Sequence, residues 1–237
     1  MFQEIQDWQL QRLGKFTASE IHKLLQSGKG KDEYFGKTAL SYIDEKIAEL
    51  ITGQPIKDIS GLAAIEWGNA HEYEGLMILQ DALGKPVTIY GGSNNMFFPY
   101  NEFSGGSIDA ETDDEVIEAK CPYNAAVHTA NLIAALKEES NAWMKKNRAE
   151  YYAQLQFNMM CRQKDKGIFY SYDPRPLNES HRKAIIRIAP DEELREGINE
   201  RLVKAAEIVS VALELLQKQP SVLIAEYDKD LNTTIVS

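Results

Sequence analysis

Apolar residues recur every three or four positions in several stretches of the chain, a pattern typical of amphipathic helices. The longest of these stretches are residues 37–52, 62–83, 149–162 and 191–217, and a shorter one covers residues 123–136. Runs rich in β-branched and aromatic residues predict strands at 87–90, 96–98, 116–120, 167–173 and 183–189. No repeat, low-complexity tract or linker divides the chain. The pattern therefore predicts one domain of mixed helices and strands.

Two polar residues interrupt the apolar stripe of the predicted helix 62–83. Asn69 and Glu72 lie about one helical turn apart on the side that is otherwise apolar. A carboxylate on a core-facing stripe needs a partner, which a metal ion would supply. A lysine, or the exit of the helix into solvent, would serve as well, and the helix alone leaves both interpretations open.

Residues 105–122 carry the densest candidate chemistry. They are expected to form a turn, a short strand ending near Asp109, a polar hairpin loop and a second strand at 116–120. Side chains alternate along a strand, so Glu118 and Lys120 share one face, which Asp109 can reach from the neighbouring strand. Converging carboxylates suit a hard ion such as Mg²⁺, and a lysine beside it suits metal-assisted phosphodiester hydrolysis. An exposed hairpin with solvated charges is the alternative, although the apolar residues around these positions favour burial.

The N-terminal region offers a possible anion site. Residues 17–20 match a capping box, with Thr17 and Glu20 bonding each other's amides at the start of a helix that continues to about Gln26. Free amides and the positive end of a helix favour phosphate, and Arg12 and Ser19 stand close by in sequence. An ordinary capped helix explains the same residues.

Composition narrows the class of protein. The chain has 237 residues, 43% hydrophobic and 26% charged, as in an ordinary globular protein. Its net charge of −10 argues against a general nucleic-acid-coating protein and would confine any DNA contact to a small patch. The two cysteines, Cys121 and Cys161, lack zinc-site spacing. With no long apolar run and no signal pattern, we expect a cytoplasmic protein without membrane contact.

Three further segments give weaker signals. Residues 137–148 combine Trp143 with basic residues and are expected to be a solvated linker, with nucleic-acid binding as the alternative. In the predicted helix 149–162, Tyr151, Gln154 and Asn158 form a stripe beside the core stripe, and Gln154 can point into the edge of a cleft. The tail at 222–227 is expected to form an edge strand or a subunit contact.

Several of these motifs, taken in order, resemble the lambda-type exonucleases. These are viral recombination nucleases with the PD-(D/E)xK fold of type II restriction enzymes. The matching stretches are residues 12–22, 66–72, 106–109, 118–122, 151–156 and 172–175. The resemblance implies an α/β (α+β) restriction-endonuclease-like core, with a central mixed sheet flanked by helices. It implies a single nuclease domain over 1–237, with a motif-bearing core at about 8–190 and a C-terminal helix and tail at 191–237.

The resemblance also implies roles for individual residues. The ligands of the catalytic Mg²⁺, for which Mn²⁺ would substitute, would be the carboxylates of Asp109, Glu118 and Glu72 and the carbonyl of Ala119. Lys120 would orient or deprotonate the attacking water, and Gln154 would hold water or ligand oxygens beside it. The 5′-phosphate of the DNA would be bound by Arg12, Ser19 and Ser107. Two features depart from the family: Ile108 replaces a proline, and the helix after Pro122 lacks basic residues, which puts its phosphate contacts in doubt.

The function implied is an Mg²⁺-dependent 5′→3′ exonuclease that degrades one strand of linear duplex DNA. The resulting 3′ overhangs would serve recombination by single-strand annealing. A homotrimeric ring, an annealing-protein partner and a phage or prophage gene in a bacterial host are implied with it. The alternatives are a structure- or site-specific endonuclease of the same fold and a non-catalytic DNA-end-binding subunit.

Overall fold

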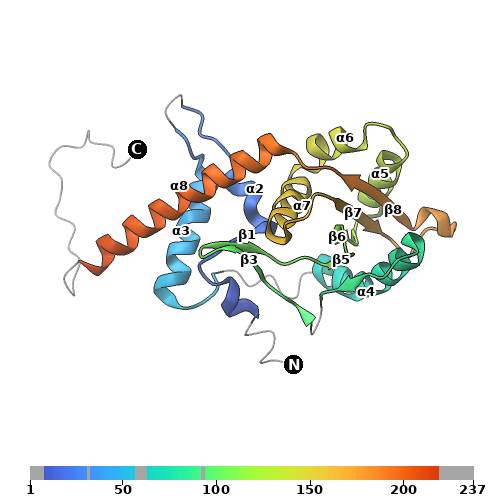
Figure 1. Ribbon diagram of the computed structural model, residues 1–237, viewed down its shortest axis with the longest axis horizontal. Helices are drawn as coiled ribbons and strands as arrows, with labels where there is room; N and C mark the ends of the chain where they lie inside the picture. The colour runs from blue at the N-terminus through green and yellow to red at the C-terminus, as the bar shows by residue number, and fades with distance from the viewer. Residues whose placement is uncertain (1–7, 31–32, 57–62, 92–93, 219–237) are drawn as a thin grey trace.

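A five-stranded sheet forms the centre of the computed structural model, which describes residues 8–30, 33–56, 63–91 and 94–218 (Figure 1). Across the sheet the strands are β2 (Thr88–Ile89), β5 (Ala110–Glu111), β6 (Val116–Lys120), β7 (Gly167–Tyr172) and β8 (Lys183–Ile188). Strands β6 and β7 are parallel, and every other neighbouring pair is antiparallel. The sheet is therefore mixed, as predicted. A smaller sheet pairs β1 (Phe16–Thr17), β4 (Ser104–Gly106) and β3 (Phe98–Asn101), in that order.

Helices cover both faces of the central sheet (Figure 1). The helices are α2 (Ile21–Leu24), α3 (Lys37–Thr52), α4 (Ala63–Leu83), α5 (Ala125–Ala135), α6 (Ser140–Asn147), α7 (Ala149–Arg162) and α8 (Glu192–Gln217). Alternation along β6 gives each face its own core: Ile117 packs with Leu76 of α4, and Val116 packs with Leu155 of α7. Within the described residues, no helix is long and apolar enough to cross a membrane.

Helix α7 lies between two cores. Its Leu155 faces the sheet, whereas its Phe157 packs with α2, α3 and α8 in a third hydrophobic cluster. All eight residues from 152 to 159 are consequently buried, polar ones included. This matters for the site, because any polar side chain that α7 directs at the sheet is held in a fixed and water-poor environment.

The sequence pattern predicted some elements to the residue and missed others. Helices α3 and α7 and strand β6 have the predicted bounds. The prediction of a capping box at residues 17–20 was wrong. Thr17 ends strand β1, and its amide donates to the Tyr42 hydroxyl at 3.0 Å. A 3-10 helix at Ala18–Glu20 then precedes the short α2. The linker prediction for 137–148 was also wrong, because helix α6 forms there and buries Met144. The tail at 222–227 lies outside the described residues.

Candidate active site

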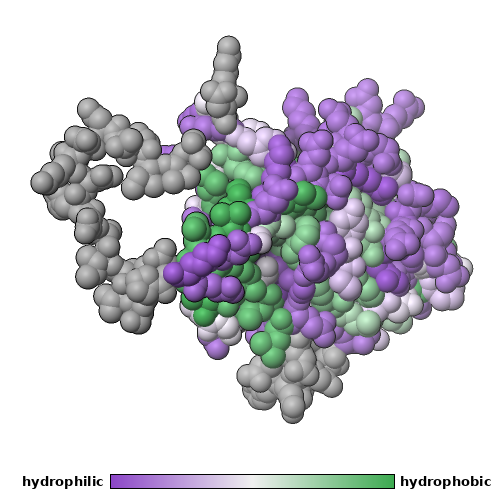
Figure 2. Space-filling model, turned by 60° about the vertical axis from the view of Figure 1, so that its left-hand side comes forward, coloured by the Kyte–Doolittle hydropathy of each residue, from purple (hydrophilic) through white to green (hydrophobic). Residues whose placement is uncertain are grey.

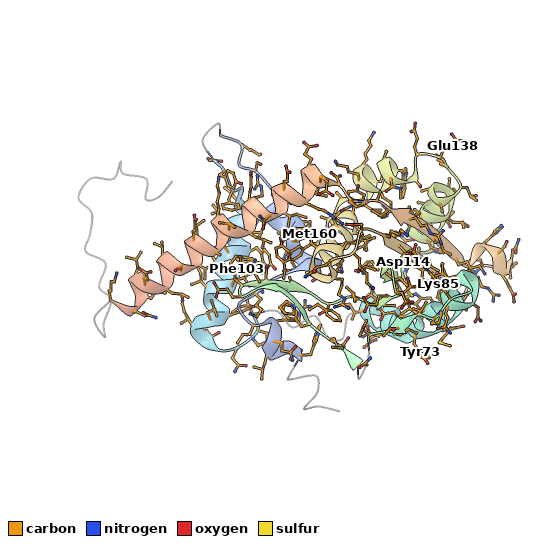
Figure 3. All side chains as sticks on the ribbon, viewed as in Figure 1. Tyr73, Lys85, Phe103, Asp114, Glu138 and Met160 are labelled. Atoms are coloured by element: carbon orange, nitrogen blue, oxygen red, sulfur yellow. The ribbon has the colours of Figure 1, made fainter. Side chains whose placement is uncertain are left out.

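The carboxylates of the β5–β6 hairpin fall into two groups. The first group pairs with basic residues from distant parts of the chain. Glu111 accepts two hydrogen bonds from Arg162, at 2.8 and 2.9 Å, and one from Lys164 at 2.8 Å. Asp114 is bound by Lys85 at 2.8 Å, and Figure 3 shows these two side chains close together. Burial raises the pKa of Glu111, but its cationic partners outweigh this effect and lower the pKa to about 2. These carboxylates hold the hairpin in place.

The second group gathers around one lysine. Glu118 is fully buried, and its Oε1 accepts a hydrogen bond from the Lys120 ammonium group, as two residues on one strand face should. The prediction of a strand ending near Asp109 was wrong, because β4 ends at Gly106 and Asp109 directly precedes β5. Its Oδ2 accepts from the Ala119 amide at 2.7 Å. Glu72 approaches from α4, where the charges of Asp109 and Lys120 act on its carboxylate and its own charge acts on Glu118. The structure therefore brings the four predicted charged residues together.

In this cluster the carboxylate groups outnumber the cationic groups. Burial, followed by repulsion from Asp109, raises the pKa of Glu72 and of Glu118 to about 8 in each case. Burial also raises the pKa of Asp109. For Lys120, burial lowers the pKa, but attraction by Glu118 and Asp109 outweighs it and raises the pKa. Three carboxylates thus share one ammonium group, whereas each hairpin carboxylate of the first group has its own cations.

Asn158 of α7 holds the other oxygen of Glu118. Its Nδ2 donates to Glu118 Oε2 at 3.0 Å, and the asparagine is fully buried. Its Oδ1 is buried with no hydrogen-bond partner among the described residues, and it lies so close to Gly106 that a Cβ at that position would be 2.1 Å away. The hydrogen bonds of Asn158 and Lys120 together fix the carboxylate plane of Glu118. Sequence reasoning placed Asn158 on the right stripe but gave it no role.

Gln154 lies one helical turn before Asn158 on the same side of α7 and is 8% exposed, so it is more buried than a cleft-edge position implies. This position on α7, one turn from Asn158, agrees with the predicted place of Gln154 beside the carboxylate cluster. On the same helix, the ring of Tyr151 lies 5.3 Å from the Lys120 ammonium nitrogen and stacks on Phe169. An aromatic face beside a cation stabilises the charged form, so Tyr151 helps to keep Lys120 in position.

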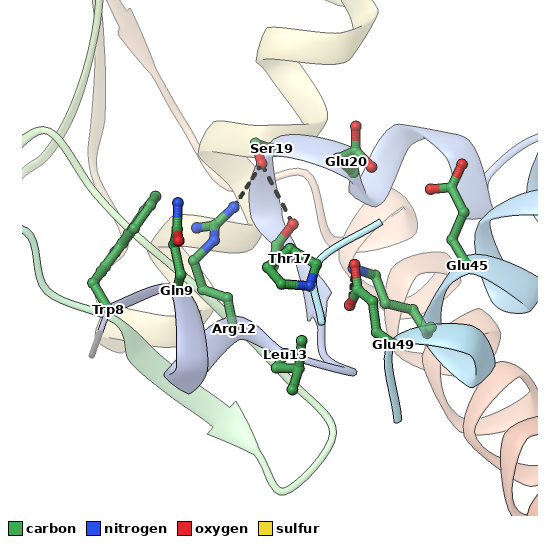
Figure 4. Close-up of a pocket in the computed structure, with 11 residues that line it drawn as sticks. Trp8, Gln9, Arg12, Leu13, Thr17, Ser19, Glu20, Glu45 and Glu49 are labelled. Atoms are coloured by element: carbon green, nitrogen blue, oxygen red, sulfur yellow. Dashed lines mark hydrogen bonds and ion pairs between the residues drawn. The ribbon is translucent and has the colours of Figure 1, made fainter. Parts of the chain in front are cut away.

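The three residues predicted to bind phosphate also come together. The Arg12 guanidinium donates to Ser107 Oγ at 3.1 Å and to Ser19 Oγ at 3.4 Å. Trp8 covers the guanidinium, with 4.5 Å from its ring to Arg12, and its indole N–H also donates to Ser107 at 3.1 Å. Figure 4 shows Arg12, Ser19 and Trp8 at one side of a pocket of about 230 Å³. Burial lowers the pKa of Arg12, as expected for a cation shielded from water.

Acidic residues line the same pocket, but two of them pair with lysines. Glu49 accepts from Lys46 at 2.9 Å and from the Gly14 amide at 2.9 Å. Glu20 forms an ion pair with Lys23 at 2.7 Å. Lys46 lies in the pocket wall beside Glu49, whereas Lys23 pairs with Glu20 from outside the lining. The charges of Glu20 and Glu49 act on Arg12, but its described hydrogen bonds go to neutral hydroxyl groups, so an anion would replace hydroxyl partners and break no ion pair of Arg12.

A short segment joins this pocket to the carboxylate cluster. Ser107 and Asp109 are separated by one residue, and two residue steps of extended chain span at most about 7 Å. Gly106, just before Ser107, packs against both Ala18 of the pocket region and Asn158 of the cluster region. The position of the pocket relative to the cluster is thus fixed by contacts on both sides of the segment.

The chemistry of the cluster fits a hard divalent cation. Its donors are carboxylate oxygens, and their pKa values are raised by burial first and by mutual repulsion second, both of which a bound cation would offset. Within the described ranges, no three His, Cys, Asp or Glu side chains form a ready-made metal site. Asp109, Glu118 and Glu72 would hold such an ion, which would supply Lewis-acid activation of water or phosphate. Lys120 would contribute positive charge next to the reacting phosphate.

The fold is similar to that of solved exonucleases. An alkaline exonuclease from Laribacter hongkongensis, LHK-Exo, is 25% identical with a TM-score of 0.72, over 90% of this chain and 96% of that chain. The same enzyme in complex with dAMP is 26% identical with a TM-score of 0.71, over the same shares. A phage-related exonuclease from Haemophilus somnus 129PT shares the fold at 20% identity, with a TM-score of 0.67 over 85% and 96% of the two chains. No curated protein matches the chain.

Together the fold and these similarities define the chain as a nuclease of the exonuclease class. A family model, the YqaJ-like viral recombinase domain, matches residues 7–165, which is more than half of the sequence. The chain therefore belongs to the YqaJ-like viral recombinase family. The predicted kinship with viral recombination exonucleases is confirmed. Every candidate site residue lies inside the matched range, whereas β7, β8 and α8 lie beyond it.

Proposed function

We propose that the protein is an Mg²⁺-dependent 5′→3′ exonuclease that degrades one strand of linear duplex DNA and leaves a 3′ overhang. The observation that carries the proposal is the pairing of two sites of complementary chemistry. One is a carboxylate–lysine cluster in which carboxylates outnumber cations, and the other is an arginine–serine pocket. The segment from Ser107 to Asp109 joins the two sites. A cutting centre held at a fixed distance from an anion pocket suits the removal of nucleotides from a phosphorylated end.

Each residue has a role in this proposal. Asp109, Glu118 and Glu72 hold the ion together with the Ala119 carbonyl, and Mn²⁺ would replace Mg²⁺. Lys120 orients or deprotonates the attacking water and stabilises the negative charge that develops on the phosphate.

Two further sets of residues support the cutting centre. Gln154 holds water or ligand oxygens beside the ion. Arg12, Ser19 and Ser107 bind the terminal 5′-phosphate.

An apolar face supports a homo-oligomer, for which the trimeric ring of the resemblance is the proposed form. Figure 2 shows apolar residues gathered on the side of the molecule formed by α3 and α8, which pack on each other. Large apolar side chains exposed on these helices include Leu50, Ile51, Val211 and Leu215. Exposed apolar surface of this kind marks contact sites. A closed ring with an acidic outer surface would also agree with the net charge of −10.

The biological role proposed is recombination by single-strand annealing, with an annealing protein as partner and a phage or prophage gene in a bacterial host. Membership of the viral recombinase family supports this context. The annealing partner would receive the 3′ overhang that the nuclease exposes.

The test uses linear duplexes with either a 5′-phosphate or a 5′-hydroxyl, labelled at the 3′ end of one strand, together with closed circular duplex. In Mg²⁺ the protein should shorten the labelled strand progressively, prefer the 5′-phosphate and leave the circle intact. The unlabelled complementary strand should persist when only one end carries phosphate. Cleavage of the closed circle would identify an endonuclease instead, and DNA binding without any cleavage would identify an end-binding subunit.

A further inference from the structure

The turn that follows β6 presents an exposed aromatic ring next to the candidate active site. Tyr123 is 56% exposed and lies three residues after Lys120. Three residue steps reach at most about 10 Å, so the tyrosine backbone stays within that distance of the lysine backbone. An exposed tyrosine is not by itself informative. Tyr123 differs from other exposed tyrosines because neighbouring side chains hold both its backbone and its ring.

Arg175 fixes the backbone of this turn. Its guanidinium donates to the carbonyl of Tyr123 at 2.9 Å and to the carbonyl of Pro122 at 3.1 Å. The same guanidinium makes two hydrogen bonds of 2.7 Å to the carboxylate of Asp173, which is 1% exposed. A bidentate pair with a buried carboxylate holds the arginine in one orientation, although the Arg175 side chain itself is 39% exposed. The turn is therefore held by β7 through its next residue, Asp173.

Trp67 supports the ring of Tyr123 from α4. The rings of Trp67 and Tyr123 meet edge to face, with centroids 6.0 Å apart. Trp67 also contacts the Arg175 guanidinium at 4.5 Å and the His71 ring at 4.1 Å. Trp67 is thus engaged by three neighbours, and it lies five residues before Glu72 on the same helix. Trp67 and His71 are half-buried, whereas Tyr123, the third ring of this group, is exposed.

A rigid aromatic ring beside a phosphodiester-cutting centre is suited to a flat apolar ligand. Holding the ring in advance lowers the entropy lost on binding, and every nucleobase offers a face for stacking. We infer that Tyr123 stacks on a nucleobase of the DNA strand that enters the active site and so places the phosphate at the cluster. This inference rests on the proposed function, which supplies DNA as the substrate.

The test compares Tyr123→Ala with Tyr123→Phe and Tyr123→Trp. A matched control is Tyr73→Ala, which removes a 65% exposed tyrosine that lies on the outer side of α4 in Figure 3. Affinity is measured in Ca²⁺ for a duplex end that carries 2-aminopurine at one of the first three positions. Alanine at position 123 should weaken binding about 5- to 150-fold and abolish the change in 2-aminopurine fluorescence on binding. The two aromatic variants and the control should behave as wild type.

A substrate without a base separates stacking from catalysis. Hydrolysis of methyl p-nitrophenyl phosphate in Mg²⁺ should be the same for wild type and Tyr123→Ala, because the variant keeps the cluster intact. Wild-type affinity and fluorescence in Tyr123→Ala would overturn the inference while leaving the proposed function standing. Failure of the wild-type protein to bind or cut any DNA would overturn both. Equal loss in Tyr123→Phe would show that the ring does not act by stacking.

Discussion

Replacing Asn158 by alanine removes the side-chain N–H that holds one oxygen of Glu118. The hydrogen bond is 3.0 Å long and fully buried, so water would not readily replace it. Glu118 would keep its contact with Lys120 but could rotate about that contact. Loss of a residue that orients a metal ligand typically costs about 10- to 100-fold in metal affinity or rate. We expect a loss of that size in Mg²⁺-dependent digestion and in Mn²⁺ affinity measured without DNA.

Gln156 provides a matched control on the same helix. It is also fully buried, but it binds the Ala189 carbonyl, the Asp191 amide and the Arg195 side chain, away from the cluster. Gln156→Ala removes three part-buried hydrogen bonds and should lower the free energy of unfolding by about 1–3 kcal/mol. Asn158→Ala should lower it by a similar amount, because it takes a donor from the buried Glu118 carboxylate.

Activity should separate the two variants where stability does not. Gln156→Ala should digest DNA at the wild-type rate at a temperature where both variants are folded. Asn158→Ala should be the slower enzyme at that temperature, because only this variant loses a contact to Glu118. The assays are urea denaturation and digestion of end-labelled duplex. Equal activity of the two variants would refute the positioning role of Asn158.

Two further predictions concern Gly106, which lies against Asn158, and the ion-paired Glu111. Gly106→Ala would put a Cβ 2.1 Å from Asn158 Oδ1 and push the amide away from Glu118. It should slow digestion about as much as Asn158→Ala does, and the double variant should be no slower than either one; additive losses would contradict this coupling. For Glu111, a folded-state pKa of about 2 against an ordinary 4.5 means that its stabilising charge is present above about pH 5 and is lost as the pH falls towards 2. Glu111→Gln should therefore be less stable than wild type at pH 7 and should lose less stability on acidification, measured by urea denaturation at each pH.

The sequence predicted those parts of the molecule that depend on local pattern. Long apolar periodicity gave α3 and α7, and alternation of side chains along β6 put Glu118 and Lys120 on one face. The capping box failed for a tertiary reason. The hydroxyl of Tyr42 on α3 accepts the Thr17 amide, and this contact replaces the local helix cap. Competition between a local rule and a distant partner is not visible in a single sequence.

The roles of the acidic residues around residue 110 also depended on distant partners. The local sequence pattern does not show that Glu111 forms ion pairs, because its partners lie more than fifty residues later. Arg162 ends α7, and Lys164 follows it. The role of Asn158 could not be predicted for a related reason. A helix buried on all sides has no polar face, so periodicity does not show which amide meets the sheet. The spacing of Gln154 and Asn158, four residues apart, was the one available signal.

The most direct test of the central claim is Mg²⁺-dependent digestion of linear duplex by wild type and by Asp109→Asn, with thermal stability measured in parallel. Asparagine keeps an oxygen for the Ala119 amide and removes one charge from a cluster that has too many negative charges. Without metal, the variant should therefore be at least as stable as wild type. Mg²⁺ should raise the melting temperature of wild type, but not that of Asp109→Asn, and only wild type should digest DNA. Wild-type digestion by Asp109→Asn would contradict the assignment of this cluster as the cutting centre.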